Sequence, residues 1–452
     1  MLLPNDYAGI EPKDMDSPEN LNAFWMPFTA NRAFKKNPRM IKAARGHHYI
    51  DSNDRELLDS FSGLWTTGLG HCHPRVVEAV QQQVAELDYV NGFQVSHPKV
   101  FELAERVVAE APKEFSQVFF TNSGSEAADT ALKIALGYHR ARGDATRLKL
   151  IGRQRGYHGV NFGGMSVGGI PANRTMFGNS LLPNVFHLRA THDPERSAFS
   201  RGQPVVGAEF AEELEALVQF HRPENIAAVM VEPVVGSGGV LVPPVGYLER
   251  LREICTRYGI LLIFDEVITA FGRIGDYFGC QRLGVIPDII TIAKSITNGV
   301  IPMGGVLVRK EIYDAFMHGP EETIEFFHGY TYSGHPVAAA AGLACMDLYD
   351  HEGPIQHARQ NETEFETELH RAADAKNVVD VRNFGLMGAI DIAPRHDAPG
   401  ARGLEAHIRC FEAGLVVRHS MDTLQFSPFL DARQEEFAET FDTVIRVLND
   451  LE

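Results

Sequence analysis

The sequence predicts an α/β protein with a large domain on a mostly parallel, doubly wound sheet and a smaller α+β domain after it. Between about residues 70 and 335, short apolar runs alternate with helical stretches, a pattern typical of parallel strands joined by crossover helices. The run 261–264 is apolar without alternation, as expected of a strand covered on both faces. From about 336 the pattern changes to a helix, several strands and a closing amphipathic helix.

The expected elements follow in chain order. Residues 47–61 indicate a short hairpin. Helices are expected at 73–87 and 97–111, because each has a proline in its first turn and apolar residues at helical spacing. Strands are expected at 117–121, 148–152, 226–231, 260–264, 288–293 and 304–308, with helices at 125–142, 208–221 and 246–258. A helix at 336–349, strands at 378–384, 386–392, 415–420 and 423–427 and a helix at 435–451 complete the chain.

The chain of 452 residues is long enough for two or three domains. We expect an N-terminal segment, 1–70, that packs with the small domain. The large ligand-binding domain is expected at 71–335 and the small α+β domain at 336–452.

Composition narrows the classes of partner. There are 42 Lys and Arg against 59 Asp and Glu, a formal charge of -17, which argues against nucleic acid or an anionic membrane as a partner. The five cysteines are far apart, without a CxxC pair, so neither a disulfide framework nor a zinc site is expected. No signal peptide or membrane span is recognised. We expect a cytoplasmic protein that binds small molecules and copies of itself.

Polar or reactive side chains follow five of the predicted strands. These are the turn 122–126, Tyr157 and His158, Glu232, the pair Asp265 and Glu266, and Lys294. Because ligands of doubly wound sheets bind beyond the carboxyl ends of the strands, these side chains are expected at one rim.

The turn Ser123, Gly124, Ser125 leads from a strand into a helix. Backbone N–H groups and hydroxyls at a helix N-terminus form an anion site, although an ordinary serine N-cap is an alternative interpretation. The turn is not a Walker loop, because no Gly-Lys-Ser/Thr follows.

Lys294 and Asp265 supply two further groups. A lysine at the end of an apolar strand is partly desolvated, which favours the neutral, nucleophilic amine; a lysine that extends to solvent is the alternative. A buried Asp265 requires a cation, such as a protonated ring nitrogen. A phosphate site, a Schiff-base lysine and an aspartate that faces a pyridinium are the groups that pyridoxal 5'-phosphate (PLP) requires.

These residues lie in motifs that resemble the class III PLP-dependent aminotransferases of fold type I. The motifs are FFTNSGSEAADTALKIA, RGYHG, VEPVVGSGGVLVPPVGYL, LLIFDEVITAFGR, PDIITIAKSITNGVIPMGGVLV and HGYTYSGHPVAAAAGLA, in this order over nearly the whole chain. The segments SGLWTTGLGHCHPRV, AFSRGQP, NIAAVMVEPVVGSGGVL and VVRHSMDTLQFSP are similar to the omega-amino acid:pyruvate branch, that of the beta-alanine:pyruvate aminotransferases.

The resemblance implies a role for each matching residue. Lys294 would form the Schiff base and carry the proton, and Asp265 would pair with the pyridine nitrogen. Tyr157 and Val267 would contact the two faces of the ring, and Gly124 and Ser125 would hold the phosphate, with Thr331 reaching it from the neighbouring subunit of a homodimer. Ser123, His158 and Glu232 complete the expected cofactor site.

For the substrate, the resemblance implies that Trp65 lines the pocket and that Arg418 and Gln425 bind a carboxylate. An arginine suits bidentate carboxylate recognition, whereas a solvated strand arginine is the alternative. Branches that use 2-oxoglutarate carry a glutamate in the turn after VEP, where this chain has Ser237, so pyruvate is the expected acceptor.

The expected reaction moves an amino group from an omega-amino acid or primary amine to pyruvate. Alternatives are taurine or an aromatic amine as the donor, a class III aminomutase, or a catalytically silent relative. A tetramer is the alternative to the dimer. No metal is expected at His71 and His73, since their His-x-His spacing offers no third ligand.

Overall fold

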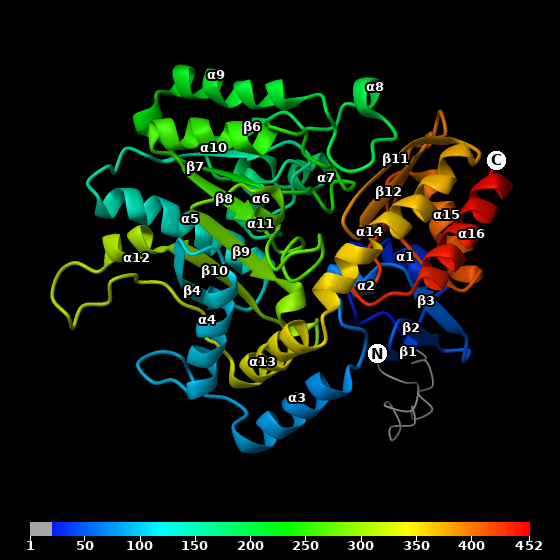
Figure 1. The fold of residues 1–452 in the computed structure, drawn as a ribbon, viewed down its shortest axis with the longest axis horizontal. Coiled ribbons are helices and arrows are strands. Elements are labelled where there is room, and N and C mark those ends of the chain that lie inside the picture. Colours follow the sequence, from blue (N-terminus) through cyan, green and yellow to red (C-terminus); the bar gives the residue numbers. More distant parts are fainter. Residues whose placement is uncertain (1–19) are drawn as a thin grey trace.

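The computed structural model describes residues 20–452, so residues 1–19 of the expected segment 1–70 lie outside the described residues. A seven-stranded sheet forms the centre of the large part of the molecule (Figure 1). Five adjacent strands run parallel, while β10 pairs antiparallel with both β4 and β9. The mostly parallel sheet is therefore confirmed. Its order is β4 (Phe115–Thr121), β10 (Gly304–Arg309), β9 (Ile289–Ala293), β8 (Leu261–Asp265), β7 (Ile226–Val231), β5 (Lys149–Arg153) and β6 (Val185–Leu188).

Helices cover both faces of this sheet. Alternate residues of β8 divide between two apolar cores: Leu261 and Ile263 belong to one, Leu262 and Phe264 to the other. The first core includes α5 (Gly124–Ala141) and α12 (Lys310–Phe316), and the second includes α4 (Pro98–Glu110), α10 (Tyr247–Tyr258) and α13 (Pro336–His351). A strand buried on both faces has no polar face, which explains the uninterrupted apolar run.

Shorter elements connect these layers. The helix expected at 208–221 begins as the 3₁₀ turn η3 (Ala208–Ala211) and continues as α9 (Glu212–His221). The other elements are α1 (Asn31–Phe34), α2 (Ser62–Trp65), α3 (Pro74–Glu86), α6 (Phe162–Val167), α7 (Pro171–Thr175), η2 (Gly178–Ser180), α8 (Pro194–Ser197), η4 (Pro223–Asn225), α11 (Gly279–Leu283) and η5 (Lys294–Thr297). Within residues 20–452, no helix is both long and apolar enough to cross a membrane.

The C-terminal part is an antiparallel sheet with helices, which confirms the predicted α+β character. The sheet order is β11 (Val378–Phe384), β12 (Met387–Ile392), β15 (Thr423–Phe426) and β14 (Arg418–Ser420). The helices are α14 (Pro354–His370), α15 (Ala401–Glu412) and α16 (Gln434–Asp450), with the turn η6 (Arg371–Asp374). They lie on the right of Figure 1.

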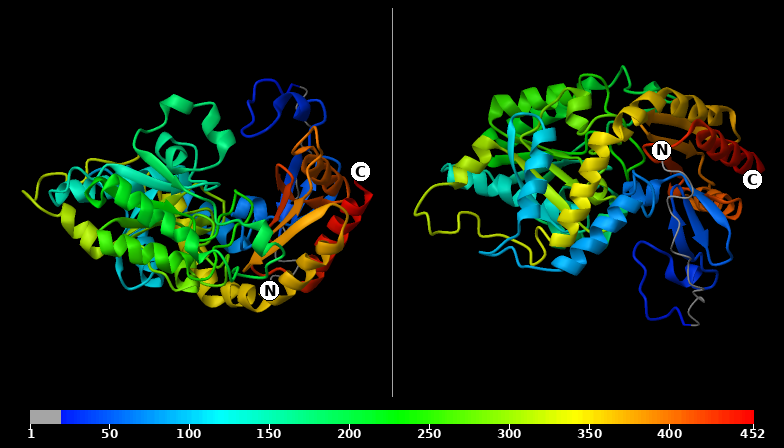
Figure 2. Two further views of the ribbon diagram at one scale, coloured as in Figure 1. Left: turned by 90° about the horizontal axis from the view of Figure 1, so that it is seen from above. Right: turned by 60° about the horizontal axis from the view of Figure 1, so that its bottom comes forward.

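A third sheet joins the two ends of the described chain. The predicted hairpin is β2 (His48–Asp51) and β3 (Glu56–Asp59), with β1 (Ile41–Arg45) beside β2. On its other edge β3 pairs in parallel with β13 (Leu415–Val416), and Figure 2 shows the blue N-terminal strands beside the red and orange C-terminal elements.

The prediction of a single strand at 415–420 was wrong. This segment divides at Val417 into β13 and β14, which belong to different sheets. The Val417 carbonyl leaves the ladder and accepts a hydrogen bond from His407 Nδ1 at 2.7 Å. This switch between sheets places Arg418 at the start of β14, next to the N-terminal sheet.

Candidate active site

The ends of the strands position the candidate residues. Asp265 is the last residue of β8, and Lys294 directly follows β9. Glu232 directly follows β7, and Tyr157 comes four residues after the end of β5. Because β5, β7, β8 and β9 are parallel, their carboxyl ends lie at one edge of the sheet.

Asp265 is 5% exposed and is held by three hydrogen bonds. His158 Nδ1 lies 2.7 Å from Asp265 Oδ2, and Thr291 Oγ1 donates to Oδ1 at 2.9 Å. The backbone N–H of Val267 also donates to Oδ1 at 3.2 Å. These contacts fix the orientation of the carboxylate at the end of the strand.

Glu232 supports the neighbouring loop. Its carboxylate accepts hydrogen bonds at 2.8 Å from the backbone N–H groups of Tyr157 and Gly236. Burial raises the pKa of Glu232, and burial likewise raises the pKa of Tyr157. Glu232 therefore ties the segment that carries Tyr157 and His158 to the glycine-rich turn after β7.

Lys294 occupies a strained backbone position beside this carboxylate cluster. Its φ is +52°, in the left-handed region that residues other than glycine seldom adopt and that often marks a functional site. Burial lowers the pKa of Lys294 to about 8, although Asp265 and Glu232 act in the opposite direction. Among residues 20–452, no side chain forms a hydrogen bond or ion pair with Lys294 Nζ, which lies 5.7 Å from the centroid of the Trp65 ring. A substantial fraction of this amine is neutral near pH 8, as a nucleophile requires.

The turn before α5 offers backbone donors. Ser123 is the N-cap, because its Oγ accepts a hydrogen bond from the N–H of Glu126 at 3.2 Å. The N–H groups of Gly124 and Ser125 come before the first intrahelical partners and remain available to a ligand. A Cβ added to Gly124 would lie 3.1 Å from both methyl groups of Val267, so a larger residue here would require Val267 to shift.

A second group of contacts joins Trp65, Arg418 and Gln425. Trp65 is 1% exposed, and the Arg418 guanidinium lies 5.5 Å from the centroid of its ring. Arg418 Nε donates to Gln425 Oε1 at 3.1 Å. Burial lowers the pKa of Arg418, and no carboxylate of the described chain forms an ion pair with it. Lys294 and Arg418 thus lie within 6 Å of the same indole ring.

Two predicted groups lie apart from these contacts. Thr331 is exposed, and its carbonyl accepts a hydrogen bond from Tyr89 at 2.8 Å. Glu266 has no cationic partner in the part of the chain that the structure describes. Its carboxylate accepts from the backbone N–H groups of Gly279 and Cys280 and from the Thr269 hydroxyl. The two adjacent carboxylates after β8 therefore have different partners.

The sequence interpretation missed two contributors. Thr291 lies inside the apolar run of β9, where a single hydroxyl in a buried strand was the available signal. Phe61 packs edge-on against Trp65, with ring centroids 4.2 Å apart, and lies 5.9 Å from the Arg418 guanidinium. No local pattern distinguished Phe61 from an ordinary core residue.

The fold is an α/β architecture that places a lysine, an aspartate and the N-terminus of α5 at one sheet edge. Residues 29–448 match the model of the family "Aminotransferase class-III". The chain belongs to this family, and it is an aminotransferase of fold type I.

Full-length relatives agree with this assignment. The chain is 52% identical to a beta-alanine–pyruvate aminotransferase of Pseudomonas aeruginosa, over 98% of this chain and 99% of the relative. It is 51% identical to an omega-aminotransferase of Caulobacter vibrioides, over 96% and 98%. An amine transaminase from an uncultivated Pseudomonas species, solved in its PLP-bound form, superposes with a TM-score of 0.88 at 33% identity, covering 97% of this chain and all of that one.

Proposed function

We propose that this protein is a PLP-dependent transaminase that moves the amino group of an omega-amino acid or a primary amine to pyruvate, giving alanine. The observation that carries the proposal is the Arg418 cation, which lacks a carboxylate partner in the described chain and shares the Trp65 ring with Lys294. A substrate carboxylate at Arg418 neutralises this charge. The relatives that share about half of their sequence with this chain include a beta-alanine–pyruvate aminotransferase.

The residues at the sheet edge fit PLP. The Nε2 atom of His158 is buried without a partner among the described residues, and the N–H groups of Gly124 and Ser125 form an anion site. Ser123 caps the same helix. When bound, PLP supplies the carbonyl carbon that takes up the amino group and a ring that withdraws electrons.

The protein supplies the positions and the proton transfers. Lys294, with its lowered pKa, would bind the cofactor and move the proton at the substrate carbon. Asp265, which His158 and Thr291 hold in place, would pair with the ring nitrogen. Tyr157 and Val267 would contact the ring, and Glu232 holds Tyr157 through its backbone N–H.

The neutral partner of Arg418 favours pyruvate as the acceptor. Gln425 Oε1 accepts from Arg418, while Gln425 Nε2 donates to the carbonyls of Gly236 and Ser237 at 3.4 Å. Within residues 20–452 no glutamate pairs with the guanidinium, so its charge remains available to a small keto acid. Trp65 limits the space beside it.

The assembly and location are part of the proposal. We propose a homodimer with shared active sites, or a tetramer of two such dimers, in which Thr331 reaches the phosphate of the neighbouring subunit; its exposure in the single chain supports this role. The N-terminal segment 1–70, the large domain 71–335 and the small domain 336–452 are the proposed divisions. All five cysteines are free thiols, which fits a cytoplasmic location.

A panel of substrates tests the function. Beta-alanine, taurine and an aromatic amine are each incubated with the PLP-loaded protein and either pyruvate or 2-oxoglutarate, and alanine and glutamate are measured. We expect alanine from beta-alanine and pyruvate at the highest rate. A higher rate with 2-oxoglutarate contradicts the acceptor assignment, and no product with any pair contradicts the transaminase itself.

A further inference from the structure

The glycine-rich turn after β7, residues 236–240, is held by side chains from three separate strands or loops. The carbonyls of Gly236 and Ser237 accept from Gln425 of β15, and the carbonyl of Gly238 accepts from Arg155 Nη2 at 2.6 Å. The next two carbonyls, of residues 239 and 240, accept from Arg382 of β11. Every carbonyl of the turn therefore has a side-chain donor.

The turn is closely packed against its neighbours. A Cβ on Gly238 would lie 2.2 Å from the Arg155 carbonyl, and one on Gly236 would lie 2.3 Å from Ile268 Cδ1. Val240 has φ = +52°, which is costly for a β-branched residue and persists only where surrounding contacts impose it. Those contacts include the hydrogen bond from Arg382 Nε to the Val240 carbonyl at 3.1 Å.

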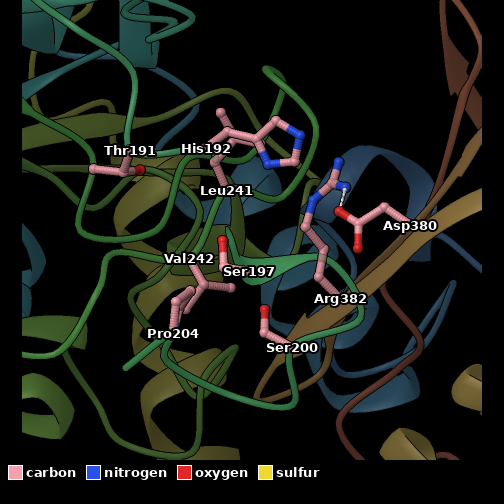
Figure 3. Close-up of a pocket in the computed structure, with 9 residues that line it drawn as sticks. All are labelled: Thr191, His192, Ser197, Ser200, Pro204, Leu241, Val242, Asp380 and Arg382. Atoms are coloured by element: carbon pink, nitrogen blue, oxygen red, sulfur yellow. Dashed lines mark hydrogen bonds and ion pairs between the residues drawn. The ribbon is translucent and has the colours of Figure 1, made fainter. Parts of the chain in front are cut away.

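Arg382 is 3% exposed and makes contacts in two directions. Toward the turn, its Nε and Nη2 donate to the Gly239 carbonyl at 3.0 and 2.6 Å. Toward its own sheet, Nη1 donates to Asp380 at 2.6 Å and to Asp391 at 2.8 Å, and Nη2 donates to Asp391 at 3.0 Å. Figure 3 shows the guanidinium between Asp380 and the ring of His192. The two carboxylates fix the orientation of the guanidinium.

The same carboxylates form a group of possible metal ligands with His192, whose ligand atoms lie within 4.8 Å of theirs. However, Arg382 already supplies a cation to both Asp380 and Asp391. A metal ion at this place would have to displace the guanidinium. The group is therefore better explained as the support of an arginine than as a metal site.

Arg382 is connected to Arg418 by two routes. Asp391, which binds Arg382, accepts a hydrogen bond from Thr423 Oγ1 at 2.6 Å, and Thr423 lies on β15 two residues before Gln425. The turn held by Arg382 also receives Gln425 Nε2. Gln425 in turn accepts from Arg418 Nε and pairs with Arg418 in the β14–β15 ladder.

We infer that Arg382 is a positioning residue for recognition of the substrate carboxylate: it fixes the 236–240 turn and β15, and these orient Gln425 and thereby the Arg418 guanidinium. This inference rests on the proposed function. Arg382 is buried and is not expected to touch the substrate. Its replacement should nevertheless weaken the binding of substrates that carry a carboxylate. Amines that lack a carboxylate form no ion pair with Arg418, so we expect them to depend less on its orientation.

The Arg382→Lys variant tests this role, because lysine keeps the charge beside Asp380 and Asp391 but cannot bridge to both turn carbonyls. For beta-alanine and for pyruvate we expect KM to rise about tenfold, the effect of losing roughly one or two hydrogen bonds. The inhibition constant of propionate, a non-reactive carboxylate, should rise by the same factor. The half-reaction with an aromatic primary amine is followed through the cofactor absorbance, without an acceptor. Its maximal rate and its half-saturation concentration should each change less than about twofold.

Two further variants separate positioning from general damage. Arg395→Lys changes an arginine of the same domain that pairs with Glu405 at the surface, and it should leave every constant unchanged. In an Arg418→Met background, Arg382→Lys should produce no additional rise in the KM of beta-alanine. Thr423→Val removes only the Thr423 to Asp391 bond, so it supplies a milder test if Arg382→Lys does not fold.

The outcomes distinguish the inference from the function on which it rests. Arg382→Lys could weaken substrates with and without a carboxylate equally, or could still raise the KM of beta-alanine in the Arg418→Met background. Either result overturns the positioning role but leaves the transaminase function intact. Wild-type protein that transaminates no donor overturns the proposed function instead.

Discussion

Asp265 accepts three hydrogen bonds, from His158, Thr291 and the Val267 N–H, and within residues 20–452 it forms no ion pair with a lysine or an arginine. We predict that Asp265→Asn keeps PLP bound, because the contacts at Gly124 and Ser125 are unchanged, yet loses at least about a hundredfold in kcat, since a neutral amide no longer stabilises a protonated ring. The measurement is kcat for beta-alanine and pyruvate together with the PLP content of the purified variant.

Thr291→Val provides the matched control for that variant. It removes one hydrogen bond at 2.9 Å to the same carboxylate and leaves its charge, so we expect a loss of less than about tenfold. Equal losses in the two variants would show that geometry rather than charge at Asp265 determines the rate.

At the scale of single residues, the polar groups that directly follow strands could be predicted from the sequence. Asp265, Glu232 and Lys294 each end an apolar run, so chain order alone brought them to one sheet edge. Arg418 and Trp65 come from segments far away in the chain, and only the family resemblance connected them. Thr291 and Arg382 act through tertiary contacts within strands, and no local pattern distinguishes such residues from other strand positions.

At the scale of elements, His47 links the N-terminal strands to α16. Its ring stacks on Phe429 with centroids 4.3 Å apart, and its two nitrogens lie 3.0 Å from Asp431 and 2.8 Å from Glu436. Burial alone lowers the pKa of His47, but the hydrogen bonds to the two carboxylates outweigh it and raise the pKa to about 9. The charged imidazole therefore stabilises the folded state.

This contact predicts a pH dependence of stability. Because the folded pKa of His47 lies above its ordinary value of 6.5, the stabilisation is complete below pH 6.5 and is lost as the pH rises through about 9. We expect His47→Gln to cost about 2 kcal/mol at pH 6 and much less at pH 9.5. Thermal melting of both proteins at the two pH values measures this; a difference that is constant with pH contradicts it.

The elements themselves were largely predictable. Periodicity identified the long helices α3, α4, α10 and α16, and uninterrupted apolar runs identified β7, β8 and β9. The run 415–420 was misread because no glycine or proline separates the apolar half, 415–417, from the polar half that begins at Arg418. Only the choice of partner strand, β3 or β15, divides it. The antiparallel direction of β10 was likewise not predictable, since an apolar run does not indicate whether a strand runs parallel or antiparallel to its neighbours.

At the scale of the whole molecule, the site lies between parts that are distant in the sequence. The large sheet supplies Asp265 and Lys294, α2 supplies Trp65, and β14 and β15 supply Arg418 and Gln425. Thr331 remains exposed in the single chain. In the proposed dimer, this residue would contact the phosphate in the neighbouring subunit, a role that it has no partner for in the single chain.

Mixing two variants tests the shared site. Lys294→Ala removes the reactive amine of a chain, and Thr331→Asp places a negative charge where the phosphate of the neighbouring subunit is expected; each variant alone should have little activity. After exchange of subunits, about a quarter of all sites combine an intact Lys294 with an intact Thr331, because half of the dimers are mixed and each has one such site. No recovery of activity in a mixture shown to contain mixed dimers contradicts the role of Thr331.

The most direct test of the whole account is the visible absorbance of the PLP-loaded protein through one reaction cycle. In the wild type we expect beta-alanine to abolish the visible band and pyruvate, added after removal of excess beta-alanine, to restore it, with 2-oxoglutarate restoring it more slowly. Lys294→Ala should show neither change at a comparable rate. A band that beta-alanine leaves intact, or a Lys294→Ala protein that cycles like the wild type, contradicts the account.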